Sequence, residues 1–284
     1  MTTNRRPLLL ILALFASSAL SGCAWVRGVA GFRQAPPPCV LTADASKEDI
    51  VAHLNENSRK LTAWKTDKAS IWTRGKGGIP MHVGATIAVE SPRNFRLIAH
   101  SPIGNEVDLG SNQQQFWFWN KHNEEKHVFL AKHDEPTKLR RFPIPFQPDW
   151  IIEALGVIDI DEEEVTMQPG PPGSNTVYLT ADRVSPQGFK VRKVTVVDTC
   201  RGVVREHGLY DARGQMIARA VLKAHVRDAK TQVMLPTQIE LDWPQAQLGI
   251  TMTLAEIDVN PARIPTDIWA VPHITGYSVY DLTQ

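Results

Sequence analysis

The sequence of 284 residues is 43% hydrophobic and 21% charged, and its formal net charge is +1 at pH 7. Acidic and basic residues are nearly balanced, which argues against nucleic acid as a partner, because such partners are bound by surfaces rich in Lys and Arg. The length suits one large β-rich domain or two small ones, and the apolar content is ample for a packed core.

The first 22 residues have the pattern of a secretory signal. Arg5 and Arg6 precede an unbroken apolar run over residues 8–15, which is short for a membrane span. Leu20-Ser21-Gly22-Cys23 follows and resembles the lipobox of bacterial lipoproteins. We therefore predict a signal peptide over residues 1–22 and acylation of Cys23, which anchors the chain to a membrane. The alternative is an ordinary cleaved signal that contains a cysteine by chance.

The residue after Cys23 bears on the destination of the protein. Ala24 stands there in place of Asp. By resemblance to the sorting rules of enterobacterial lipoproteins, this favours the outer membrane over the inner one. Loss of Arg5 and Arg6 with the signal lowers the formal charge from +1 to −1.

Residues 23–45 are Pro-rich and lack periodicity, which predicts a lipidated Cys followed by a flexible tether. The domain proper is expected over residues 46–284. Two more cysteines, Cys39 and Cys200, either form a disulfide in an oxidising compartment or remain free buried thiols. Ser46 begins a capping-box pattern, and apolar residues at helical spacing then predict an amphipathic helix to about Leu61.

The clearest strand pattern lies between residues 91 and 121. Phe116 and Phe118 alternate with Trp117 and Trp119, so both faces of this strand are large and aromatic. A sheet covered on one side only would place polar residues on its other face. Apolar material is therefore expected on both sides of this strand, or a groove that stays open to receive it.

The rest of the chain is again mostly strand. Residues 149–156 predict a short and very apolar helix, and a second meander fills residues 176–258. The expected fold is mainly β: a curved, antiparallel, unclosed half-barrel of about eleven strands, lidded by the two helices. We expect two helices to leave part of so large a concavity unfilled, which predicts a hydrophobic cavity of the kind that binds acyl chains or apolar peptides.

This order of elements resembles the periplasmic lipoprotein carriers and receptors of the LolA/LolB kind. The resemblance spans roughly residues 44–282 and rests on the leading helix and on four stretches: residues 92–97, 116–119, 148–152 and 209–214. It implies a protein that binds acyl chains of lipoproteins or other lipids in envelope biogenesis, with a periplasmic carrier protein as a possible partner. The lipid anchor is like that of the membrane-bound receptor. Proteins with this fold also act as envelope sensors, so a sensor or structural lipoprotein that binds a protein through the same groove is the alternative.

Catalytic chemistry has little support in the sequence. It contains no Gly-x-Ser-x-Gly, P-loop, His-Glu-x-x-His or Cys-x-x-Cys pattern. His122, His127 and His133 form the densest histidine group, for which a solvated hairpin is a better account than a metal site. The acidic run over residues 159–164 is better read as a solvated turn than as a catalytic pair. We expect no enzyme activity, no cofactor and no metal.

The candidate ligand-binding residues are apolar side chains on the strands and on the short helix. Either they line the cavity or they are simple core, and the sequence does not decide which phase of the alternation faces inward. The predicted lining comprises Leu97, Leu109, Phe116, Phe118, Trp150, Ile151, Leu155, Ile250, Met252 and Leu254.

Overall fold

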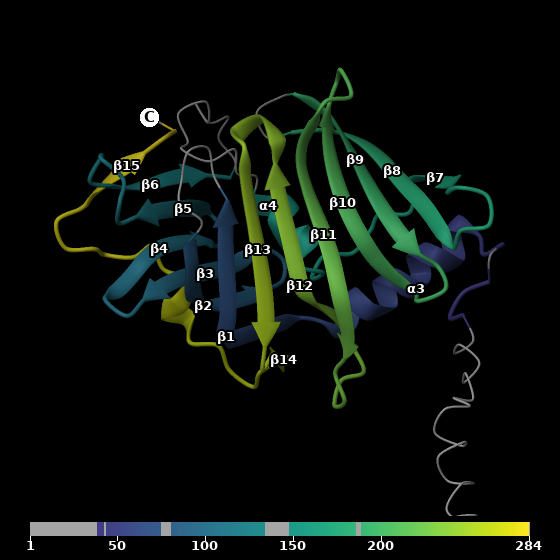
Figure 1. Ribbon diagram of the computed structural model, residues 1–284, viewed down its shortest axis with the longest axis horizontal. Helices are drawn as coiled ribbons and strands as arrows, with labels where there is room; N and C mark the ends of the chain where they lie inside the picture. The colour runs from purple at the N-terminus through teal and green to yellow at the C-terminus, as the bar shows by residue number, and fades with distance from the viewer. Residues whose placement is uncertain (1–38, 43, 75–80, 134–147, 186–188, 284) are drawn as a thin grey trace, which may run out of the picture. The chain divides into compact units, whose positions relative to one another are not determined.

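The computed structural model describes residues 39–42, 44–74, 81–133, 148–185 and 189–283 (Figure 1). Residues from Cys39 to Gln284 form one compact unit. The predicted signal peptide, Cys23 and the tether up to residue 38 lie outside the described residues. At the end of the predicted tether, the amides of Val40 and Leu41 donate to the carbonyls of Cys200 and Thr199, so these residues are part of the folded unit.

The described residues contain two α-helices, two short 3-10 helices and fifteen strands. The helices are α3 (Lys47–Lys60), α4 (Pro148–Ala154), η2 (Pro244–Ala246) and η3 (Thr266–Trp269). The strands of the first half are β1 (Ala63–Arg74), β2 (Met81–Glu90), β3 (Asn94–Ser101), β4 (Gly104–Ser111), β5 (Gln115–Asn120) and β6 (His127–Lys132). Those of the second half are β7 (Thr166–Pro169), β8 (Thr176–Val184), β9 (Lys190–Asp198), β10 (Val203–Asp211), β11 (Met216–Arg227), β12 (Met234–Trp243), β13 (Leu248–Ala255), β14 (Asp258–Val259) and β15 (Ser278–Asp281).

All the strands belong to one open sheet, as predicted. Its order is β15-β6-β5-β4-β3-β2-β1-β13-β12-β11-β10-β9-β8-β7, and β14 pairs with β1. Every pairing is antiparallel except that of β15 with β6. The sheet has more strands than the expected eleven because β7, β14 and β15 are too short to show a clear alternation.

The strands are not in sequential order throughout the sheet. The first meander runs outward from β1 to β6, and the second runs inward from β7 to β13, which pairs with β1. Two strands that are consecutive in the chain, β6 and β7, therefore lie near opposite edges of the sheet. The connection between them contains α4, and Figure 1 shows α4 behind the strands, within the curve of the sheet.

The strand register decides which side chains share the concave face. Leu97 lies opposite Leu109, which lies opposite Phe118, so these three side chains point to the same side. Across the β1–β13 junction, Ile71 lies opposite Met252. These residues belong to one apolar cluster that also contains the side chains of α4. The large apolar residues of both meanders thus face the same interior.

The aromatic strand β5 is covered on both sides, as its sequence predicts. Phe116 and Phe118 face the concave interior, while Trp117 and Trp119 form a separate cluster on the outer face with Val128. Residues of the C-terminal segment, including Val271, Ile274 and Tyr277, pack over this outer cluster.

A buried ion pair holds the C-terminal segment on this outer face. Arg96 binds Asp108 at 2.6 Å, donates to the carbonyl of Ile268 at 2.7 Å and lies over the ring of Trp117. Trp117 in turn donates to Asp108 at 3.0 Å. The C-terminal segment is thus fixed by hydrogen bonds to charged groups as well as by apolar contacts.

No helix in the described part of the chain is long and apolar enough to cross a membrane.

Candidate binding site on the concave face

Helix α4 lies on the concave face and fills part of it. Trp150, Ile151, Ile152 and Leu155 are each at most 4% exposed and belong to the main apolar cluster with the inner residues of the sheet. Trp150 meets Trp243 edge to face, with 6.2 Å between ring centroids. The indole of Trp64 donates to the carbonyl of Leu155 at 3.4 Å.

The structure brings all ten predicted lining residues into this one cluster. Nine of them are less than a tenth exposed, and Ile250 is partly buried and packs against the others. The choice between the two alternation phases is resolved by the register, because the chosen strand residues face α4. Whether they bind a ligand stays a prediction, since in this arrangement the side chains of α4 take up the surface that a ligand needs.

The polar side of α4 makes contacts that the sequence alone did not reveal. Glu153 forms ion pairs with Lys193 of β9 and with Arg183 of β8, the latter at 2.9 Å. Arg183 also binds Glu164 at 2.9 Å. The sequence of β9 contains an indication of this polar group, because Lys193 and Thr195 occupy the same face as buried Val191 and Val197. Polar residues at core positions of a strand indicate a buried polar partner.

Burial controls the protonation of this polar group. It lowers the pKa of Lys193, although the charge of Glu153 acts in the opposite direction. Burial, and after it the positive charge of Lys193, lowers the pKa of His207 well below its ordinary value of 6.5. His207 is therefore neutral at neutral pH, and its Nδ1 lies 3.2 Å from the hydroxyl of Thr195.

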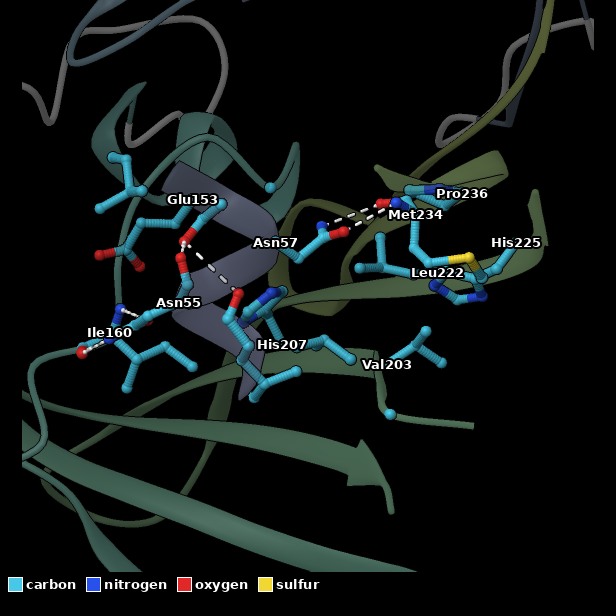
Figure 2. Close-up of a pocket in the computed structure, with 16 residues that line it drawn as sticks. Asn55, Asn57, Glu153, Ile160, Val203, His207, Leu222, His225, Met234 and Pro236 are labelled. Atoms are coloured by element: carbon cyan, nitrogen blue, oxygen red, sulfur yellow. Dashed lines mark hydrogen bonds between the residues drawn. The ribbon is translucent and has the colours of Figure 1, made fainter. Parts of the chain in front are cut away.

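A small cavity of about 80 Å³ lies beside these residues, between α3, α4 and strands β10 to β12 (Figure 2). His207, His225 and Glu153 are among its polar lining residues, and Leu222 and Met234 are among the apolar ones. Pockets for drug-sized ligands usually have about 300–1,000 Å³. This cavity is too small to hold a long acyl chain.

Helix α3 is fixed to its surroundings much more firmly than α4. It begins with the predicted capping box of Ser46 and Asp49. Asn55 exchanges two hydrogen bonds of 2.8 Å with the backbone of Ile160, and Asn57 does the same with Met234 at 3.1 and 2.7 Å (Figure 2). Each asparagine therefore joins α3 to a different segment of the chain.

Apolar contacts and a covalent link add to this attachment. Ile50, Val51 and Leu54 pack in a second apolar cluster with residues of β8, β9 and the segment before β7. Just before the helix, Cys39 is joined by a disulfide to Cys200, which lies 161 residues further along the chain. Of the two lids expected from the sequence, α3 is thus a permanent part of the fold.

The three histidines and the acidic run that the sequence singled out do not form a common site. His122 binds Glu106 at 2.7 Å, while His127 and His133 contact Ser278 and Ser111. In the described residues, no three His, Cys, Asp or Glu side chains are grouped closely enough to hold a metal ion. The acidic run forms an exposed turn, whose Glu164 takes part in the ion pair with Arg183.

Comparison with known proteins gives similarities of structure only. No protein-family model matches the sequence, and no curated protein matches it. A DUF1329 family protein from Desulfovibrio piger has a TM-score of 0.52 and 9% identity over 78% of this chain and 95% of its own. A putative outer membrane lipoprotein-sorting protein domain from Vibrio parahaemolyticus has a TM-score of 0.53 and 7% identity over 78% of this chain and 97% of its own.

A LolA superfamily protein from Nitrosomonas europaea is also similar, with a TM-score of 0.49 and 10% identity over 80% of this chain and 98% of its own. At identities this low, the likeness to the Desulfovibrio and Vibrio structures concerns the fold and not the activity. The described part of the chain therefore has the fold of these two structures, in agreement with the fold expected from its sequence.

Proposed function

We propose that this protein binds acyl chains of lipoproteins, or of another lipid, on the concave face of its sheet during envelope biogenesis. It is attached through the acylated Cys23 to the outer membrane, faces the periplasm and receives its cargo from a periplasmic carrier protein. It performs no covalent chemistry. Binding consists of the exchange of α4 for acyl chains on the apolar surface.

One observation carries this proposal: a helix of only seven residues packs on the apolar concave face. The large apolar side chains of α4 and of the residue directly after it are Trp150, Ile151, Ile152 and Leu155, and all four belong to the main cluster. Burial of such side chains contributes about 1.5–3 kcal/mol each, or about 6–12 kcal/mol for the four. An acyl chain of about fifteen methylenes contributes a similar amount, at about 0.8 kcal/mol per methylene. One long acyl chain can therefore offset the loss of the α4 contacts.

The fold is consistent with this role. The similar Vibrio parahaemolyticus structure is described as a putative outer membrane lipoprotein-sorting protein domain, and the likeness extends over 97% of its chain. The sequence signals at Cys23 point independently to an envelope lipoprotein.

The proposal is tested by native mass spectrometry of the protein from residue 24 onward, which contains the whole folded unit Cys39–Gln284. We expect co-purified lipid, which is then identified after extraction, and uptake of a fluorescent fatty acid by the delipidated protein. Hydrogen exchange of the α4 amides should become faster when the fatty acid binds, while exchange in α3 stays unchanged. A ligand-free protein that takes up no fatty acid would contradict the proposal, and a search for a protein partner in the same groove would follow.

A further inference from the structure

Helix α4 places a negatively charged side chain, that of Glu153, on the concave face. Its apolar residues lie in the main cluster, while Glu153 points to the cations of β8 and β9. The helix thus combines an apolar body with a buried carboxylate, whose side chain is 12% exposed. An acyl chain with an anionic head group has the same two parts.

The cations that receive Glu153 belong to the sheet and stay in place when α4 leaves. Lys193 projects from the inner face of β9, with a side chain that is 11% exposed, and Arg183 projects from the same face of β8. Arg183 has donor capacity to spare, because its Nε is buried and has no hydrogen-bond partner among the described residues. The other carboxylate partner of Arg183, Glu164, lies outside α4 and stays in place. Lys193, in contrast, loses the ion pair with Glu153 when α4 leaves.

Displacement of α4 by a neutral ligand therefore has a free-energy cost that an anionic ligand avoids. The ammonium of Lys193 would lie in the concave interior beside Thr195 and neutral His207, without its hydrogen-bonded carboxylate and with only the more distant charge of Glu164 opposing it. A buried charge that loses its partner is strongly destabilising. A carboxylate or phosphate at the position of Glu153 restores the ion pair and the charge-assisted hydrogen bonds.

We infer that Lys193 and Arg183 form a receptor site for the anionic head group of the acyl ligand, and that Glu153 occupies this site while α4 covers the concave face. The inference rests on the proposed function and narrows its ligand class to anionic amphiphiles. Glu153 acts as a built-in competitor, so an anionic lipid releases α4 more readily than a neutral lipid of the same chain length.

The test compares two probes with the same chain, oleate and oleyl alcohol, below their aggregation concentrations and at pH 7.5. Their affinities for the protein from residue 24 onward are measured by displacement of a fluorescent fatty acid. We expect oleate to bind about tenfold or more tightly than oleyl alcohol, as for a charge-assisted contact. Inorganic phosphate, an anion without a chain, should not displace the fluorescent fatty acid at millimolar concentrations.

Variants show which residues discriminate oleate from oleyl alcohol. Lys193→Met should bring the ratio of the two affinities close to one. If this variant does not fold, Arg183→Gln, at a more exposed position, replaces it and should reduce the ratio. Arg192→Gln is the matched control, because Arg192 lies on the opposite face of β9 in an exposed pair with Asp182 at 2.8 Å. Its ratio should equal that of the wild type. Glu153→Gln should raise the affinity for oleate, because it removes the competing carboxylate.

The outcomes separate the two proposals. Equal binding of oleate and oleyl alcohol by the wild-type protein would overturn the head-group site and leave lipid binding intact. Failure of both probes to bind would overturn the proposed function, and the head-group site with it. A preference for oleate that persists in both Lys193→Met and Arg183→Gln would place the anion elsewhere and would also overturn the inference.

Discussion

The two helices on the concave side are held in very different ways. The fourteen residues of α3 have a complete capping box, two asparagines that each bind another segment, an apolar cluster and a disulfide just before the first turn. The seven residues of α4 are held by their apolar side chains, by Glu153 and by a half-exposed pair of Asp149 with Arg93 at 3.5 Å. Elements that open for function come from the least stable part of a structure.

The helices also cover different parts of the sheet. The cluster of α3 involves β8 and β9, whereas the cluster of α4 includes inner residues of β1 to β6 and of β11 to β13. The larger apolar surface is thus under the less firmly held helix. Helix α3 thus completes the fold, whereas under the proposed function α4 regulates access to the concave face. Four predictions test this difference.

The largest effect is expected from removal of the disulfide. Cys39→Ser with Cys200→Ser should lower the free energy of unfolding by about 2–5 kcal/mol, because the bond closes a long loop in the unfolded chain. Urea denaturation measures this change. Fatty-acid affinity under native conditions should stay the same, since α4 is not involved. A loss of affinity without a loss of stability would indicate that α3 also takes part in opening.

Weakening the polar contact of α4 should act locally. In Glu153→Gln, Lys193 and Arg183 lose their ion pairs with the helix. A hydrogen bond to a charged group contributes about 1.5–3 kcal/mol, so exchange of the amides of residues 152–155 should accelerate about tenfold to a hundredfold. Hydrogen exchange read by mass spectrometry measures this. Equal acceleration in α3 would mean that the two helices open together.

The asparagine contacts of α3 should affect global stability instead. Asn55→Ala leaves the partly buried backbone N–H and C=O of Ile160 without the partner that they have in the wild type. We expect a loss of about 1–3 kcal/mol in the free energy of unfolding, measured by urea denaturation. Asn105→Ala, at an exposed position of β4, is the control and should change little. If the buried and the exposed variant are equally stable, the contact does not anchor the helix.

The smallest effect concerns pH. The folded-state pKa of His207 lies well below 6.5, so below pH 6.5 the unfolded chain takes up a proton that the folded protein does not. Its contribution to stability is present in full above pH 6.5 and is lost as the pH falls toward the lowered pKa. The slope is at most about 1.4 kcal/mol per pH unit. His207→Gln should weaken the dependence of the thermal unfolding midpoint on pH between pH 7.5 and 5. A pH dependence equal to that of the wild type would show that His207 takes up its proton in the folded state.

Local sequence patterns determined the elements and the faces of this protein. The alternation around Phe116 and Trp117 indicated a strand with apolar cover on both sides, and the structure has that cover. Ser46 and Asp49 marked the start of α3, and the apolar run after Pro148 marked α4. These features are readable because periodicity and capping involve residues only a few positions apart.

Only the tertiary structure decided how distant segments meet. The pairing of β1 with β13 joins residues that are far apart in the chain, and no local pattern specifies it. Glu153 meets Arg183 and Lys193 across 30 and 40 residues, and this ion-pair group exists because α4 crosses the concave face between the two meanders. The sequence by itself determined an open, apolar β-sheet with two helices. Packing and long-range hydrogen bonds decided which helix is anchored more firmly and which charges α4 covers, because these interactions form only once the chain has folded.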